Sequence, residues 1–120
     1  MSKRTIVAGV ALLVLAFAPA TASTAGAAKP VQKAVYVGDY FLTPERLSVP
    51  KGSTITWRWP SAPGDLHDVY SQSRPKGAKR FKSKLAASDY RYRRTVTKPG
   101  RYVVICTLHP QMRQTIRVRR

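Results

Sequence analysis

Residues 98–112 read KPGRYVVICTLHPQM, and this stretch joins the clearest turn-and-strand pattern of the chain to three potential metal ligands. The Pro-Gly pair predicts a tight turn that starts a strand over residues 101–106. Side chains alternate between the two faces of a strand, so Tyr102, Val104 and Cys106 share one face, which we expect to be the inner one. The stretch therefore predicts a β-strand that ends at a cysteine and continues into a short loop.

The same period-2 alternation recurs upstream and downstream of this strand. Its clearest instance is residues 54–59, where Ile55, Trp57 and Trp59 share one face. Further β-type runs lie around Val35 and Val37, Leu47 and Val49, Val69 and Tyr70, and over residues 90–96 and 115–119. Short strands separated by turns predict an all-β fold, an antiparallel sandwich or barrel.

The least regular part of the chain is residues 71–88, which carry six basic side chains and no acid. We expect this segment to form a surface excursion that Phe81 and Leu85 hold against the core. Its basic run over residues 74–84 is interpreted first as a solvated face.

The N-terminal residues have the order of a secretory signal peptide: a positive start at Lys3 and Arg4, thirteen apolar-dominated residues over 6–18, then Pro19 and small residues. Cleavage after Ala22 or Ala27 would suit the small-residue rule. A retained membrane anchor is the alternative, but thirteen residues fall short of the roughly 20 that span a bilayer. We expect residues 1–27 to be the signal peptide, 28–34 a lead-in and 35–120 one domain. The expected location is periplasmic, extracellular or associated with the cell envelope.

Composition adds two constraints. The chain has 22 Lys and Arg against five acids, and removing residues 1–27 would leave a net charge of +15. Such a charge indicates anionic partners: cell-wall polyanions, anionic lipid headgroups or an acidic protein. An exported protein rarely meets nucleic acid, so nucleic acid is not an expected partner. The single Cys106 excludes an internal disulfide, and an unpaired thiol in an exported protein is expected to be buried or held by a metal.

Cys106, His109 and Met112 supply a thiolate, an imidazole and a thioether within seven residues. These soft donors favour copper over magnesium or calcium. His67 is the only other histidine, and the only other methionine is Met1. Two imidazoles, one thiolate and a weak axial thioether form a site that both Cu(I) and Cu(II) accept. Each residue alone is more often a core or loop residue, but together they predict one copper ion per chain.

With these residues the chain resembles the cupredoxins, the blue copper proteins, and among them plastocyanin, pseudoazurin and amicyanin. The resemblance covers roughly residues 35–119 and rests on Phe41, residues 47–57, residues 67–69 and residues 99–112. The C-x2-H-x2-M spacing looks most like amicyanin. The resemblance implies a Greek-key β-sandwich with copper at one end, one-electron transfer between redox partners, and a ring edge of His109 that reaches the surface within an apolar patch.

Two positions depart from the family pattern. Asp68 stands where an Asn commonly donates hydrogen bonds toward the cysteine loop, and an ionised Asp can only accept. Leu66 stands where a Pro is usual. We expect these changes to affect the surroundings of the ligands and the reduction potential rather than the ligands themselves.

Other functions stay open beside electron transfer. The chain could be a copper carrier or scavenger, or a basic adhesive protein with a vestigial site. An enzyme with Cys106 as nucleophile and His109 or His67 as base would need an orienting third group and a substrate cleft, so we do not expect an enzyme. Two histidines are too few for a multicopper oxidase. We expect a monomer with redox partner proteins. Docking of an acidic redox partner is the alternative interpretation of residues 74–84, beside a solvated face.

Overall fold

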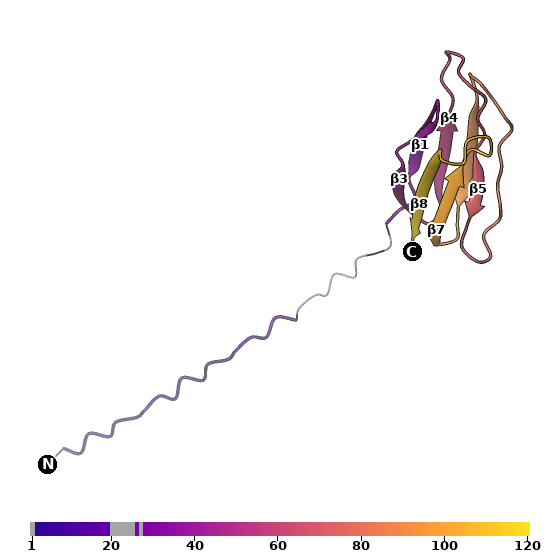
Figure 1. Cartoon of the computed structure of the whole chain (residues 1–120). Helices are drawn as coiled ribbons and strands as arrows, with labels where there is room; N and C mark the ends of the chain where they lie inside the picture. The colour runs from indigo at the N-terminus through magenta and orange to yellow at the C-terminus, as the bar shows by residue number, and fades with distance from the viewer. Residues whose placement is uncertain (1, 20–25, 27) are drawn as a thin grey trace.

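Eight β-strands follow one another between residues 32 and 119 of the computed structural model (Figure 1). They are β1 (Gln32–Gly38), β2 (Phe41–Thr43), β3 (Arg46–Pro50), β4 (Ser53–Arg58), β5 (Tyr70–Ser73), β6 (Arg91–Val96), β7 (Gly100–Ile105) and β8 (Arg113–Arg119). The model describes residues 2–19, 26 and 28–120. Both candidate cleavage positions, Ala22 and Ala27, lie outside these residues. Within the described residues no helix is long and apolar enough to cross a membrane.

The strands form two four-stranded sheets, with orders β2-β1-β4-β6 and β3-β8-β7-β5. The two sheets lie face to face as the layers of a sandwich (Figure 1), so the expected all-β sandwich is confirmed. The expectation of a wholly antiparallel arrangement is wrong, because β1 pairs with β4 and β3 pairs with β8 in parallel. The strands of each parallel pair are not consecutive in the chain. The alternation of side chains predicts which face of a strand is buried, but not whether the neighbouring strand runs parallel or antiparallel to it.

The core lies between the two sheets and consists of the inward residues that the alternation predicts. Ile55 and Trp57 of β4 are fully buried, as are Val104 of β7 and Ile116 of β8. A polar link also crosses the core: Trp57 Nε1 donates to Gln114 Oε1 at 3.0 Å. Gln114 Nε2 in turn donates to the carbonyl oxygen of Pro44 at 2.6 Å. The buried amide is thereby satisfied and ties β4 to β8.

The segment after β5 leaves the sheet and returns along its edge. Phe81 is buried, with its ring centroid 5.6 Å from that of Trp57, as expected. The expectation for Leu85 is wrong, because its side chain is 45% exposed. Its neighbour Ala86 pairs with His67 through backbone hydrogen bonds of 3.0 Å in both directions, which turns Leu85 outward. The returning segment therefore positions His67 through its backbone.

Candidate metal centre

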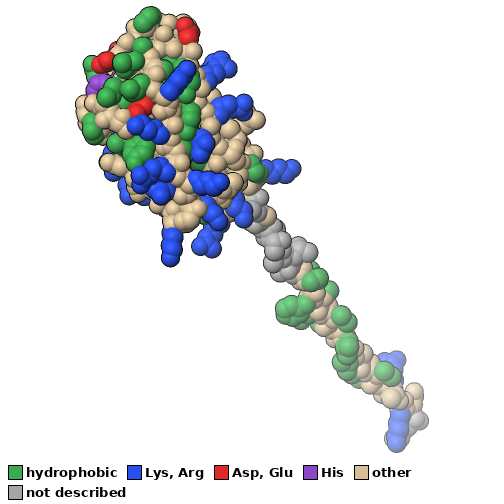
Figure 2. All heavy atoms as spheres, turned by 90° about the vertical axis from the view of Figure 1, so that its right-hand side faces the viewer, with side chains coloured by type: hydrophobic (Ala, Val, Ile, Leu, Met, Phe, Trp, Pro, Cys, Tyr) green, Lys and Arg blue, Asp and Glu red, His purple; other side chains and the backbone are tan. Residues whose placement is uncertain are grey.

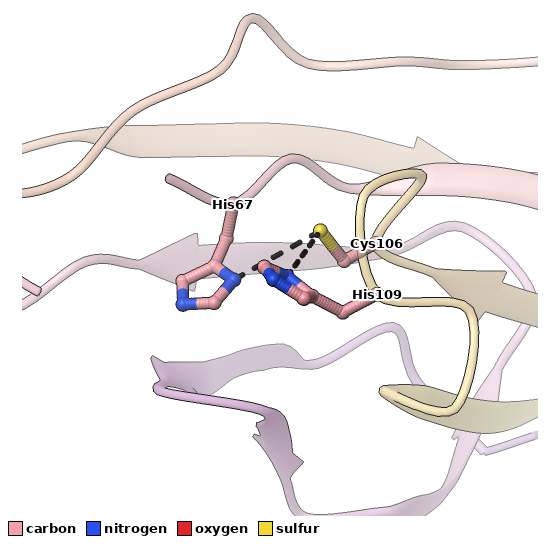
Figure 3. A group of neighbouring side chains, drawn as sticks. All are labelled: His67, Cys106 and His109. Carbon is pink, nitrogen blue, oxygen red and sulfur yellow. Dashed lines mark hydrogen bonds between the residues drawn. The ribbon is translucent and has the colours of Figure 1, made fainter. Parts of the chain in front are cut away.

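His67, Cys106 and His109 come together at one end of the sandwich, and both imidazole rings face the sulfur atom (Figure 3). The Sγ atom of Cys106 lies 3.6 Å from Nδ1 of His109 and 3.9 Å from Nδ1 of His67. All three potential ligand atoms lie within 4.8 Å of one another. Residues 39 positions apart in the chain are thus brought to one point.

The loop from Cys106 to Met112 is held by its own backbone. His109 N donates to Cys106 O at 3.2 Å, and Met112 N donates to His109 O at 2.8 Å. Cys106 N donates to Met112 O at 3.2 Å and closes the loop between β7 and β8. Met112 is 1% exposed and belongs to the same core cluster as Cys106. The loop thereby holds the cysteine, the second histidine and the methionine in one compact turn.

The spacing of these atoms fits a bound metal ion. Metal–sulfur and metal–nitrogen bonds of about 2.3 and 2.0 Å, at the trigonal angle of about 120° that a His2Cys copper site adopts, place sulfur and nitrogen about 3.7 Å apart. The two observed separations of 3.6 and 3.9 Å lie on either side of this value. A thiolate and two imidazoles at this spacing are the donor set that copper prefers.

Carboxylates contact the outer nitrogen of each ring. His67 Nε2 lies 2.9 Å from Asp39 Oδ1, and His109 Nε2 lies 3.5 Å from Asp65 Oδ2. The hydrogen bond with His67 holds the pKa of Asp39 below its ordinary value. The backbone N–H of Leu66 is the main cause of the lowered pKa of Asp65. A carboxylate at Nε2 favours the tautomer that carries its proton on Nε2. This tautomer leaves the lone pair of Nδ1 available on the side that faces the Cys106 sulfur, as is usual for histidines that bind a metal.

Tyr40 joins these carboxylates to the His109 ring. Its hydroxyl donates to Asp65 Oδ2 at 3.1 Å, which raises the pKa of Tyr40. Its ring stands edge-on to that of His109, with centroids 4.8 Å apart and an interplanar angle of 85°. Tyr40 has a φ of 69°, a left-handed conformation that is uncommon for a bulky residue and that occurs preferentially at functional sites.

The turn that contains Asp39 and Tyr40 is bonded to the loop that precedes His67. Asp39 Oδ1 accepts from the backbone N–H of Asp65 at 2.9 Å. A Cβ atom at Gly64 would lie 2.7 Å from the same carboxylate oxygen, so this close approach requires glycine. The β1–β2 turn and the loop before His67 therefore form one unit behind the histidine rings.

Asp68 connects the segment of His67, which precedes β5, to the cysteine loop. Its Oδ1 accepts from Thr107 N at 2.7 Å, and its Oδ2 accepts from Thr107 Oγ1 at 2.6 Å. Asp68 is fully buried. A carboxylate can only accept hydrogen bonds, and here both donors come from Thr107, so the departure from the usual Asn is matched by its partner. The two ligand-bearing segments are thereby tied together, with Thr107 as the donor and Asp68 as the acceptor of both bonds.

The two histidines differ in access to solvent. The side chain of His67 is 3% exposed and that of His109 is 18% exposed. Large exposed side chains near His109 in the fold are Tyr40, Leu66 and Leu108. The ring edge of His109 therefore reaches the surface, as the resemblance implies, but beside both apolar groups and the half-exposed carboxylate of Asp65 rather than within a purely apolar patch.

Sequence reasoning did not identify Asp39, Tyr40 and Asp65 as parts of this site. One signal was available, because the chain has only five acidic residues. Each is therefore conspicuous, and two of the five contact the histidine rings.

No family model and no curated protein sequence matches the chain, whereas solved structures do. A Cu-containing nitrite reductase from Thermus scotoductus SA-01 is 31% identical with a TM-score of 0.62, over 82% of this chain. The chain spans only 25% of that protein. A reduced proline-to-phenylalanine variant of amicyanin is 27% identical with a TM-score of 0.63, over 73% of this chain and 82% of that one.

A methionine-to-alanine variant of amicyanin with Cu(I) is 26% identical over the same shares of the two chains, with a TM-score of 0.63. The similarity covers the sandwich, and the cluster of His67, Cys106 and His109 with the buried Met112 matches a type 1 copper site. On these grounds the chain has the cupredoxin fold and carries the side chains of a type 1 copper site.

Proposed function

We propose that the chain binds one copper ion through His67, Cys106, His109 and Met112 and carries single electrons between redox proteins. The observation that supports this most directly is the spacing of the Cys106 sulfur and the two Nδ1 atoms, which suits a bound metal ion. Bound copper would supply a one-electron Cu(I)/Cu(II) couple. The amicyanin structures similar to this chain include oxidised and Cu(I) forms.

The chain's own residues restrict movement around the site. Asp39 holds the outer nitrogen of His67, and the carboxylate of Asp68 holds the residue that follows Cys106. A ligand set fixed in this way changes little between oxidation states, which favours rapid electron exchange.

Electrons would enter and leave through the exposed edge of His109. The surface around it combines apolar side chains, with Leu66 46% and Leu108 51% exposed, with the half-exposed carboxylates of Asp39 and Asp65. The loop segments at this end, residues 38–41, 60–68 and 106–112, contain no Lys or Arg. We propose that the redox partner docks on this end and that the positive charge elsewhere steers acidic partners toward the protein.

We also propose that residues 1–27 are a secretory signal peptide and that the mature protein works as a monomer in the periplasm, outside the cell or at its envelope. The charge, apolar and small-residue order of these residues supports this, as does the unpaired Cys106, which copper would protect.

The test is a visible absorption spectrum of the purified protein with added Cu(II). We expect an intense thiolate-to-Cu(II) band that disappears on reduction and returns on reoxidation. Cys106→Ser should abolish the band, while Gln111→Ala, at an exposed position of the same loop, should retain it. A colourless or irreversible Cu(II) complex would contradict electron transfer. Transfer of copper to an acceptor protein faster than electron exchange would favour the carrier.

A further inference from the structure

We propose that the outer faces of the two sheets bind a flexible polyanionic chain of phosphate groups and leave the copper-site end of the molecule free. This proposal concerns the basic surface and does not depend on copper binding.

The first surface lies on the sheet that contains β4 and β6. Arg58 and Arg91 are directly opposite each other on these strands, and Arg93 is opposite Thr56. All three arginines are exposed, and they line a hollow of 340 Å³ on the outer face together with Lys33. Three guanidinium groups therefore gather on one small area.

The second surface repeats this arrangement on the other sheet. Arg101 of β7 is directly opposite Arg117 of β8, and both line a hollow of 430 Å³ with Arg46. They also line an adjoining hollow of 370 Å³ with Arg119 and Arg120. The two hollows share Arg101 and Arg117, so a continuous basic track runs along this face.

Among the described residues, these arginines form no ion pair. In the part of the chain that the structure describes, the ion pairs involve His67 and His109, and none involves a Lys or an Arg. Like charges directly opposite each other on neighbouring strands destabilise a sheet. Each sheet contains one such arginine pair, so an anion between the two guanidiniums would relieve their repulsion. Guanidinium groups bind phosphate through two parallel hydrogen bonds, which lysine cannot do.

The placement of the arginines indicates a flexible chain rather than a membrane. The two surfaces lie on opposite sides of the sandwich, and a flat lipid surface could contact only one of them at a time. A flexible polymer could follow both. Nucleic acid is less suited to the second surface, because the residues between its arginines are Ser48, Leu47 and Thr115, which offer no aromatic ring for base stacking. On the first surface the half-exposed Tyr36 of β1 is directly opposite Arg58, so a direct comparison with single-stranded DNA decides there.

The segments around the histidines, residues 38–41, 60–68 and 106–112, contain no Lys or Arg. Figure 2 shows Lys and Arg side chains spread over the body of the domain, whereas hydrophobic, acidic and histidine side chains gather toward the end drawn at the top. A polymer held by the two basic surfaces would therefore leave His109 accessible to another protein.

The test measures the affinity of the metal-free and copper-loaded protein for long-chain inorganic polyphosphate by calorimetry at several salt concentrations. One variant combines Arg58→Gln, Arg91→Gln and Arg93→Gln, and a second combines Arg46→Gln, Arg101→Gln and Arg117→Gln. The control removes the same charge from exposed loop positions with Lys76→Gln, Lys79→Gln and Lys98→Gln.

We expect each arginine variant to lose about tenfold or more in affinity and to reduce the slope of log K against log salt by about 2 to 3. The control should lose much less, and copper should make no difference. An equal loss in all three variants would overturn the proposal, because binding would then depend on net charge alone. Tighter binding to phosphatidylglycerol vesicles or to mixed-sequence single-stranded DNA at the same salt would overturn the choice of polymer.

Folding of the variants is checked by thermal unfolding. If an arginine variant does not fold, NMR of the unsubstituted metal-free protein decides. Polyphosphate should shift the amide signals of β4, β6, β7 and β8 and leave residues 38–41 and 106–112 unchanged. The opposite pattern would overturn the proposal.

Discussion

Asp68 offers the sharpest test of how the site is held together. Its buried carboxylate accepts two short hydrogen bonds from Thr107, one from the backbone N–H and one from the hydroxyl. Asp68→Ala removes both and leaves the N–H of Thr107, in a partly buried position, without its acceptor. We expect the segment of His67 and the loop of Cys106 to lose their direct polar connection.

The magnitude follows from these contacts. A hydrogen bond to a charged group contributes about 1.5–3 kcal/mol. Two such bonds that share one carboxylate should together be worth about 3–4 kcal/mol, a large part of a typical unfolding free energy of about 5–15 kcal/mol. Asp68→Asn keeps an oxygen for the backbone N–H and can donate to the hydroxyl of Thr107, so it should cost only about 1 kcal/mol. Thr107→Val removes one bond and should lie between the two.

The assay is urea unfolding of the metal-free protein for each variant and for the Asp68→Ala/Thr107→Val double variant. The double variant should cost less than the sum of the single ones, because both substitutions remove the same interaction. Equal losses of unfolding free energy for Asp68→Asn and Asp68→Ala would refute the reasoning, because the asparagine amide would then not replace the carboxylate as a hydrogen-bond acceptor. Full additivity in the double variant would show that the two residues act independently.

Two further predictions concern the histidine rings and the alkaline limit of stability. Asp39→Asn weakens the hold on His67 Nε2 and should lower Cu(II) affinity about 10- to 100-fold; if Cu(I) affinity is unchanged, the reduction potential rises by about 60–120 mV. Competition with a chelator and voltammetry measure both values, and unchanged values would show that the carboxylate does not act through the ring. Burial raises the pKa of Tyr102, so the folded state favours the neutral phenol. This stabilisation is intact below the unfolded-state pKa of about 10 and is lost as pH rises through the folded-state pKa. Tyr102→Phe should therefore flatten the loss of stability above about pH 10, and an unchanged pH profile would assign that loss to other groups.

Much of the site follows from residue types and local spacing. Cys106, His109 and Met112 lie within one loop, so their proximity needs only the turn that the sequence predicts. His67 is the only other histidine, and its place just after a loop made it the natural fourth residue. The strands are predictable for the same reason, because the alternation of apolar side chains is a local pattern.

The groups behind the rings could not be predicted in this way. Asp39 and Tyr40 lie in a turn between β1 and β2, and Asp65 lies in a loop more than twenty residues later. Their contacts with the histidines depend on how the two sheets are packed, which no local pattern describes. Leu85 is expected to be buried because it is apolar. The backbone pairing of Ala86 with His67 instead turns the Leu85 side chain outward, and no local pattern predicts that pairing.

By itself the sequence determined the all-β class, the four candidate ligands and the excess of positive charge, because these depend on composition and on periods of a few residues. Only the tertiary structure decided that β1 and β3 pair in parallel with β4 and β8. It also showed that Thr107 supplies both donors to Asp68 and that arginines face each other across neighbouring strands. These features arise between segments distant in the chain, and strand register and sheet packing set which side chains meet.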